Sequence, residues 1–365
     1  MQSERWRADR LDTRLAQGRL APVHVCAVAT ALARRHAQAE SRSTHAPALD
    51  EEIAALRDRL VASGHDAARL DAAHAHLAHL LANDRARFEA RIARGAIRPI
   101  HGALGMDSVF VDARSQASID EPAEPIVADT SRDVARLALS LRRVGRADLA
   151  ERFVAAYAEA SDDFALYPLL AFYEALAALD LATQSSDGYE ASRWLGYARP
   201  SPPRARPQVV AVGGRAASGK STIATRLAAE LGAPLVSAHG VCASGGDEWS
   251  LFLALAERAA PVLDSGRSLV LDATFASQAT RRAVARLARE RGAPFLFTEC
   301  SAYDDTRRRR LAARSPSPAT SAATEWEPVR DLEGGVHVVV DTNRAEPRGF
   351  ARVRRILPAA TSLVA

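Results

Sequence analysis

"VAVGGRAASGKSTIATRL", residues 210–227, contains the only lysine of the chain, Lys220. Together with Gly214, Gly219 and Ser221 it satisfies the spacing G-x-x-x-x-G-K-[ST]. An apolar run precedes the pattern and a helical run follows it, which is the strand, turn and helix context that this motif requires. A guanidinium is planar and forked, whereas an ammonium is a compact point charge. We therefore expect Lys220 to lie in a cradle of main-chain N–H groups where an arginine would not fit.

A cradle of this kind binds the phosphates of a nucleotide. Its glycines let N–H groups converge on the β-phosphate, Lys220 bridges the β- and γ-phosphates, and the Ser221 hydroxyl is placed to ligate Mg²⁺. The pattern therefore predicts ATP and Mg²⁺ as ligands. The residues expected to line the nucleotide site are Gly214, Arg215, Ala216, Ala217, Ser218, Gly219, Lys220, Ser221 and Thr222.

A second acidic group is expected at the end of a neighbouring strand. Asp272 ends the apolar run "RSLVLD", and strand ends of this kind collect metal ligands at the carboxyl edge of a parallel sheet. We expect Asp272 to hold Mg²⁺ through water, with a helix cap as its structural alternative. Asp341 in "VHVVVD" is the weaker candidate, and its alternative role is to shape a loop against the adenine.

Arginines are expected to neutralise the charge that develops on a transferred phosphoryl group. In "DDTRRRRLAAR", Arg310 and Arg314 are spaced i,i+4 and share one helix face, so we expect both to reach one bound nucleotide. The rest of this run is typical of a solvated helix face. Arg281 and Arg282, early in the helix after Asp272, are lesser candidates for the same role.

The second half of the chain alternates between apolar runs and helical stretches. The runs are "QVVAV", "APLVS", "RSLVLD", "PFLFTEC" and "VHVVVD". Such alternation predicts an α/β fold in which a parallel sheet is flanked by helices on both faces. We therefore expect residues 208–365 to form a nucleotide-binding domain.

The proline-rich stretch "YARPSPPRARP", residues 197–207, neither continues a helix nor joins the middle of a sheet, and we place the domain boundary there. Residues 1–196 are mostly helical in pattern. "DVARLALSLRRV" is typical, because its apolar residues repeat at the spacing of one helix face. The exception is a glycine-containing stretch around Val109 and Val111, which predicts a loop followed by a small hairpin.

Composition narrows the class of protein further. The chain has 365 residues, a formal net charge of +4 and 48% hydrophobic residues, which is a globular composition that does not imply nucleic-acid binding. Its three cysteines lie far apart and are expected to be reduced. No apolar run approaches the roughly 18 residues of a membrane span. We expect a cytoplasmic protein; its oligomeric state is not encoded in these patterns.

The second half resembles a known family. "VAVGGRAASGKST", "LDATF" followed by "RR", "RLAAR" and "VVDT" are similar to the P-loop kinases of small molecules and nucleic-acid ends that include gluconate kinase and chloramphenicol phosphotransferase. The resemblance covers residues 207–357. It implies transfer of the γ-phosphate of Mg·ATP to a hydroxyl group.

Relatives in that family commonly carry Ser-Asp after the second strand, where the Asp accepts the proton of the acceptor hydroxyl. This chain reads "LVSAHG", so Ala238 or His239 occupies the place. His239 is a chemically suitable base near neutral pH. Asp247 in "GGDEW" is the alternative, and the absence of any base is the third.

The first half resembles the C-terminal lobe of aminoglycoside phosphotransferase-like kinases. "IRPIHGALGMDSVFVD" is similar to their catalytic loop, H-G-D-x-H-x-x-N, but Ala103, Gly105 and Ser108 replace its aspartate, histidine and asparagine. The lobe's metal-binding aspartate would correspond to Asp120 or Asp129, with helix capping as the alternative for Asp129. The resemblance implies a pseudokinase domain with a scaffolding or substrate-presenting role.

Two functions follow from these patterns. One is an ATP-dependent phosphotransferase with an unidentified hydroxyl-bearing acceptor. The other is a nucleotide-binding regulatory protein with little or no transfer activity. The intact phosphate motif favours the first, and the missing carboxylate of the expected base favours the second.

Overall fold

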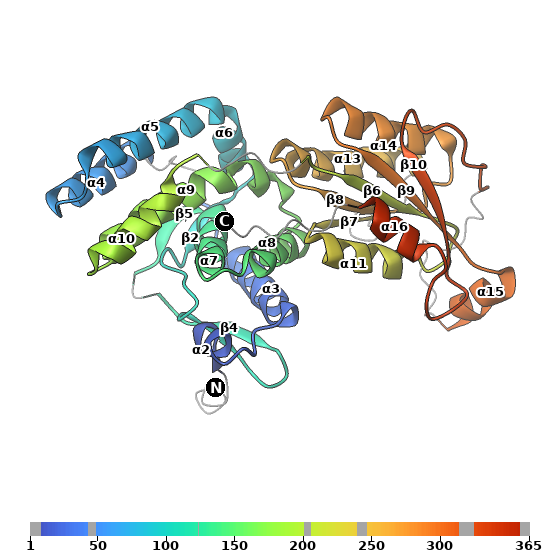
Figure 1. Cartoon of the computed structure of the whole chain (residues 1–365), viewed down its shortest axis with the longest axis horizontal. Helices are drawn as coiled ribbons and strands as arrows, with labels where there is room; N and C mark the ends of the chain where they lie inside the picture. Colours follow the sequence, from blue (N-terminus) through green and yellow to red (C-terminus); the bar gives the residue numbers. More distant parts are fainter. Residues whose placement is uncertain are drawn as a thin grey trace. The chain divides into compact units, whose positions relative to one another are not determined.

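The computed structural model describes residues 9–42, 49–122, 124–200, 206–238, 247–313 and 325–357. They form two compact units, Met1–Pro203 and Arg204–Ala365. The first is mostly helical, and the second is an α/β unit (Figure 1).

A five-stranded parallel sheet forms the centre of the second unit. Its strands lie in the order β10-β9-β6-β8-β7, so β6, which leads into the phosphate motif, is the central strand. Their bounds are β6 Val209–Gly213, β7 Leu235–Ser237, β8 Leu269–Asp272, β9 Phe295–Ser301 and β10 Val336–Asp341. All five residues of β6 and all four of β8 are buried, as expected for strands covered on both faces.

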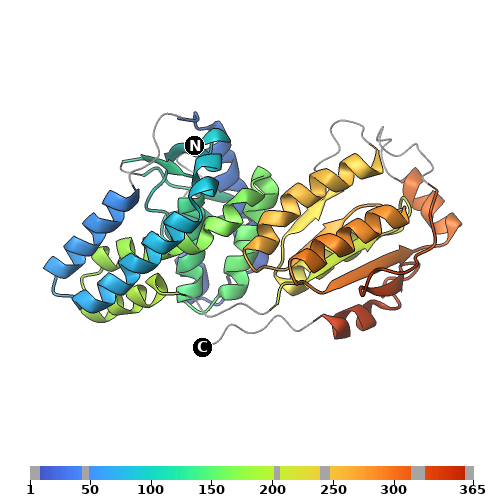
Figure 2. The same cartoon turned by 90° about the horizontal axis from the view of Figure 1, so that it is seen from above.

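Helices cover both faces of this sheet (Figures 1 and 2). They are α11 Lys220–Leu231, α13 Glu248–Asp264, α14 Gln278–Glu290 and α16 Phe350–Ile356, whereas α15 Asp304–Ala312 lies away from both faces (Figure 1). On one face, Val210 and Val212 of β6 pack with Ile223 and Leu227 of α11 and Phe350 of α16. The expected α/β class is therefore observed, with helices α13 and α14 on the opposite face (Figure 2).

The first unit consists of helices around two small antiparallel sheets. The helices are α2 Leu11–Ala16, α3 Pro22–Gln38, α4 Leu49–Ala62, α5 Ala67–Asn83, α6 Arg85–Ala93, α7 Ser131–Arg143, α8 Ala147–Ser161, η1 Phe164–Leu169, α9 Leu170–Gln184, α10 Gly188–Leu195 and η2 Gly196–Ala198. Its strands are β1 Asp9–Arg10, β2 Ile97–Ile100, β3 Val109–Val111, β4 Ala117–Ile119 and β5 Ile126–Asp129. The pair β3 and β4 is the expected hairpin, while the pairing of β2 with β5 has no local signal because 25 residues separate the two strands.

One apolar stretch differs from the sequence-based expectation. Among the described residues, the helical stretch Phe164–Gln184 is long and apolar enough by composition to cross a membrane, although 67% of its apolar window is buried within the structure. It begins as the 3₁₀ turn η1, which contains Pro168. Burial of this extent is typical of a core helix.

A buried ion pair secures the start of α7. Arg91, 2% exposed, donates from Nε and Nη2 to the two carboxylate oxygens of Asp129 at 2.9 and 2.7 Å. It also binds Asp163, and Asp129 in turn accepts from the Ser131 N–H at 2.8 Å. Asp129 therefore has the capping and pairing role, which accounts for both of its oxygens.

Replacing Arg91 by alanine is expected to lower the free energy of unfolding of the helical unit by about 3–5 kcal/mol, because Asp129 is left as an uncompensated buried charge. Amide hydrogen exchange of α7 in the full chain measures the effect. Arg85→Ala is the matched control, since Arg85 pairs with Glu89 on the surface and is expected to cost about 0.5 kcal/mol or less. Equal protection in both variants would contradict the assignment.

Candidate functional site

The phosphate-binding loop joins β6 to α11 and has the backbone conformation that its glycines permit. Gly214 has φ +148° and Gly219 has φ +88°. A Cβ at Gly214 would lie 2.5 Å from the carbonyl oxygen of Cys300, so this position has no room for a side chain. Ala217, with φ +59°, occupies the left-handed region without being glycine, which costs about 1–2 kcal/mol and requires support from surrounding contacts.

That support comes from outside the loop, on its carbonyl side. Arg307 Nε of α15 donates to the Ala216 carbonyl at 3.0 Å, and Arg310 Nη1 donates to the Ala217 carbonyl at 3.3 Å. The Thr342 hydroxyl, which follows β10, donates to the Ser218 carbonyl at 2.5 Å. We call the carbonyls of Ala216, Ala217 and Ser218 the outer carbonyls.

The contacts of Arg310 differ from those expected of a phosphate clamp. Besides the Ala217 carbonyl, its guanidinium donates to the Thr342 carbonyl at 2.6 Å. The γ-phosphate role of Arg310 stays a prediction, and its partner in that role, Arg314, lies outside the described residues. Arg308, by contrast, is exposed and pairs with Asp305 of its own helix, as expected for a solvated face.

Asp272 lies at the buried carboxyl end of β8, beside the loop. Its Oδ2 accepts from the Ser237 hydroxyl at 3.3 Å, and it is 2% exposed. The pKa of the Cys300 thiol is raised to about 12, chiefly by burial and then by the Asp272 charge, while the Lys220 charge opposes the shift. Lys220 and Asp272 therefore act on the same small region, at the end of the central strands.

The donor set at this point fits a hard cation. Asp272 Oδ1 is buried and has no hydrogen-bond partner within the described residues. A buried carboxylate oxygen of this kind requires a partner, since an unsatisfied acceptor is costly. Carboxylate and hydroxyl oxygens, here of Asp272 and Ser221, are ligands that suit Mg²⁺.

The candidate bases and the weaker candidates have separate outcomes. The Asp247 carboxylate caps α13 by accepting from the Ser250 N–H at 2.8 Å, and this bond holds the pKa of Asp247 below its ordinary value. His239 lies outside the described residues. Asp341 accepts from the N–H and side-chain amide of Asn343, which lowers its pKa and orders the loop after β10.

Arg281, the lesser candidate for a phosphate clamp, is a structural residue. It is fully buried and donates to the main-chain carbonyls of Phe275 and Glu327 at 2.9 and 2.6 Å. Its guanidinium also lies 5.0 Å from the Trp326 ring centroid. Its donors bond main-chain carbonyls and Gln278 Oε1, and the clamp role predicted as a lesser option stays a prediction.

A polar cleft of about 220 Å³ adjoins the loop. It lies between Arg215 and Ser218 of the loop, Glu299 at the end of β9, Arg307 of α15 and Trp326. Glu299 Oε2 and His337 Nε2 lie 2.9 Å apart and share a hydrogen bond. The cleft therefore offers hydroxyl, carboxylate and guanidinium groups at the carboxyl edge of the sheet.

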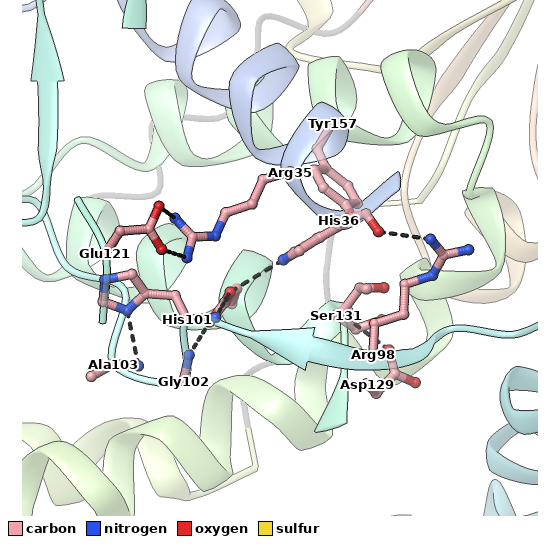
Figure 3. Close-up of polar contacts among 12 residues, drawn as sticks. Arg35, His36, Arg98, His101, Gly102, Ala103, Glu121, Asp129, Ser131 and Tyr157 are labelled. Carbon is pink, nitrogen blue, oxygen red and sulfur yellow. Dashed lines mark hydrogen bonds and ion pairs between the residues drawn. The ribbon is translucent and has the colours of Figure 1, made fainter. Parts of the chain in front are cut away.

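In the first unit, the loop after β2 is held by a buried carboxylate. Asp133 of α7 accepts from the N–H groups of His101 and Gly102 at 2.9 and 2.8 Å, and from His36 Nε2 at 3.2 Å. Figure 3 shows His36, His101 and Gly102 at this loop. Burial alone would raise the pKa of Asp133, but the His36 ring and the two N–H groups hold it below its ordinary value. The backbone of this loop is therefore fixed, and Ala103 within it carries only a methyl group.

Both histidines near this loop have partners on both ring nitrogens. His36 Nδ1 lies 2.8 Å from the Tyr157 hydroxyl, opposite its contact with Asp133. His101 Nδ1 accepts from the Ala103 N–H at 3.3 Å, and its Nε2 lies 3.2 Å from Asp120. Asp120, directly after β4, is thus placed beside the loop. Among the described residues, no group of three or more His, Cys, Asp or Glu side chains is arranged to hold a metal ion.

Comparison with known proteins agrees with the geometry of the loop. Residues 209–328 match the family model AAA_33, an AAA domain. That span begins with β6 and contains the loop, Asp272 and α15. We call the second unit the P-loop domain, after its G-x-x-x-x-G-K-[ST] loop between β6 and α11.

The chain is also similar to individual proteins. Uncharacterized proteins of Mycobacterium bovis and Mycobacterium tuberculosis are 29% identical over 268 residues, which cover 65% of this chain and 54% of theirs. The chain therefore spans about half the length of the curated relatives it matches. Among solved structures, a sugar kinase from Janibacter sp. HTCC2649 has 22% identity, 44% coverage of this chain, 99% of that chain and a TM-score of 0.35. A gluconokinase from Sinorhizobium meliloti 1021 has 23% identity, coverages of 42% and 97%, and a TM-score of 0.30.

Thr342 and Asp133 have no role in the sequence-based prediction, and Arg307 belongs to the run predicted to be a solvated helix face. Thr342 and Arg307 act on the loop from about 120 and 90 positions away, and no local pattern reports such contacts. Asp133 did leave a signal: it lies one and two helical turns before Leu137 and Leu141, which share the buried stripe of α7. A charged residue on such a stripe indicates a buried hydrogen-bond network.

Replacing Gly214 by alanine is expected to lower the free energy of unfolding of the P-loop domain by more than about 2 kcal/mol and to abolish nucleotide binding, because the new Cβ meets main chain. Thermal unfolding and calorimetric titration measure both effects. Gly292→Ala is the control: Gly292 has φ +64° but nothing within 4 Å, so only the backbone strain of about 1 kcal/mol applies. Nucleotide binding by Gly214→Ala at the wild-type level would contradict the assignment.

Proposed function

We propose that the protein is an ATP-dependent phosphotransferase whose reaction takes place at the P-loop domain. The observation that carries the proposal is that the single lysine, Lys220, begins α11 after the central strand β6, while the buried carboxylate of Asp272 ends β8, the strand next to β6. The match to an AAA domain supports nucleotide binding by the same residues. The acceptor is an unidentified small molecule, or nucleic-acid end, that carries a hydroxyl group.

The chemistry follows from the arrangement of charges. An acceptor hydroxyl oxygen bonds to the γ-phosphorus, the bond from that phosphorus to the β,γ-bridging oxygen breaks, and ADP leaves. Lys220 and the N-terminus of α11 stabilise the negative charge on the β- and γ-phosphate oxygens. Mg²⁺, held by Ser221 and through water by Asp272, would supply further charge neutralisation. The proton acceptor is His239, Asp247 or solvent.

The polar cleft beside the loop suits the acceptor. It lies at the carboxyl edge of the sheet, where ligands of parallel α/β folds bind. Glu299 and Arg215 supply a hydrogen-bond acceptor and a donor for a hydroxylated compound. Trp326 closes one side with an apolar ring.

For the helical unit we infer a degenerate aminoglycoside phosphotransferase-like domain. Asp133 keeps the main chain of His101 and Gly102 in place, and Asp120 lies beside the same loop. Ala103 has no group that orients or deprotonates a hydroxyl. A scaffolding or substrate-presenting role is consistent with a preserved loop backbone that has lost its reactive side chain.

A nucleotide-binding regulatory protein is the second candidate. The observation in its favour is the capping bond of Asp247, since a carboxylate with a lowered pKa is a poorer proton acceptor. Radiolabelled ATP with a panel of sugars, aminoglycosides and 5′-hydroxyl oligonucleotides separates the two. Transfer of label to any acceptor excludes a binding-only protein, whereas tight binding without transfer favours it.

Replacing Lys220 by alanine is expected to weaken ATP binding tenfold or more, on the order of 1.4 kcal/mol, because the ammonium is lost while the backbone cradle stays. Isothermal titration calorimetry with Mg·ATP measures the change. Arg308→Ala is the charge-matched control, since that exposed side chain pairs only with Asp305 among the described contacts. Unchanged affinity in Lys220→Ala would overturn the nucleotide-site assignment.

A further inference from the structure

The outer carbonyls of the phosphate-binding loop are bonded by side chains from two separate elements. Arg307 and Arg310 belong to α15, and Thr342 follows β10. Three consecutive carbonyls are thus bonded by donors that lie about 90 to 125 positions away in the chain. These contacts depend on α15 and on the residue after β10, and not on the sequence of the loop itself.

Because the peptide group is planar, the contacts of these carbonyls also fix the direction of the loop N–H groups. In a trans peptide the carbonyl of one residue and the N–H of the next point opposite ways, and the described chain contains no cis peptide. The Ala216 and Ser218 carbonyls face α15 and Thr342, so the N–H groups of Ala217 and Gly219 face the interior of the loop. The N–H of Ser218 closes the turn on the Arg215 carbonyl at 3.1 Å.

The donors also strengthen the N–H groups that they orient. Hydrogen bonds from a guanidinium are charge-assisted, and a polarised carbonyl makes the N–H of the same peptide a better donor. The Thr342 hydroxyl has one proton, and the Ser218 carbonyl at 2.5 Å is nearer than the Ser301 carbonyl at 3.1 Å. Arg310 Nη1 lies 3.3 Å from the Thr342 hydroxyl oxygen, so the two side chains form one network.

We propose that Thr342 and Arg310 are positioning residues that aim the loop N–H groups at the β-phosphate. The inference rests on nucleotide binding at the loop, as proposed above, and assigns Arg310 a role other than a γ-phosphate clamp. The strained backbone of Ala217 explains why support is needed: without it this residue would leave the left-handed region. Helix α15 thereby becomes part of the nucleotide site without touching the nucleotide.

Comparison of two nucleotides distinguishes the two roles of Arg310. We call a residue that positions the loop N–H groups a brace. A brace acts through these groups on the β-phosphate, which both ADP and ATP carry, so its loss weakens the binding of both nucleotides by the same factor. Loss of a clamp on the γ-phosphate weakens the binding of ATP alone. The probes are therefore Mg·ADP and a Mg²⁺ complex of a non-hydrolysable ATP analogue, titrated calorimetrically into the full-length protein.

Thr342→Val and Arg310→Ala are expected to weaken both nucleotides by about five- to twentyfold, as for the loss of one or two hydrogen bonds to a loop. The ratio of the two dissociation constants should stay within about twofold of wild type, and Thr342→Ser should restore binding. Thr298→Val is the matched control, because the buried Thr298 hydroxyl has no hydrogen-bond partner within the described residues. Arg308→Ala is the control for charge on α15.

Each outcome decides one point. If the variants lose affinity for the ATP analogue alone, the positioning role is wrong and Arg310 is a γ-phosphate clamp. If Thr342→Val binds both nucleotides as well as Thr298→Val does, the positioning role of Thr342 is wrong. Wild-type protein that binds neither nucleotide would overturn the proposed function instead. Arg310→Ala removes a half-buried side chain outside the core, so it keeps the test available if Thr342→Val does not fold.

Discussion

The central constraint of this structure is that the outer carbonyls of one loop must face outward so that the N–H groups of Ala217 and Gly219 face inward. Arg307, Arg310 and Thr342 satisfy that constraint from outside. The sheet serves it too, because β6, the central strand, delivers the loop to the carboxyl edge, and β9 and β10 deliver α15 and Thr342 to the same edge. Lys220 and Asp272 then add charge to a cradle whose shape is already set.

In the helical unit, too, side chains from other elements hold the backbone of a loop. Asp133 fixes the backbone of the loop after β2 through two main-chain N–H groups, and Arg91 fixes the start of the helix that carries Asp133. These contacts are buried and fully paired. Ala103 at the centre of the loop has no reactive group. The shape of this loop is therefore set by side chains outside it, as is the shape of the phosphate-binding loop.

Local sequence predicted what depends on local geometry. The phosphate motif, the strand before it and the helix after it are separated by few residues, and the five apolar runs of the second half all became strands of one sheet. What the sequence did not show depends on distant contacts: the pairing of β2 with β5, the commitment of Arg281 to main-chain carbonyls, and the bonds of Arg307 and Thr342 to the loop. Arg310 was singled out from helix spacing, which reports a shared face but not the group that the face contacts.

The most direct test of the account is a crystal structure of the protein with Mg²⁺ and a non-hydrolysable ATP analogue. The account predicts β-phosphate oxygens within hydrogen-bonding distance of the Ala217 and Gly219 N–H groups, with the Ser218 carbonyl still bonded to Thr342. A nucleotide bound elsewhere, or a loop whose outer carbonyls have turned toward the phosphate, would contradict it.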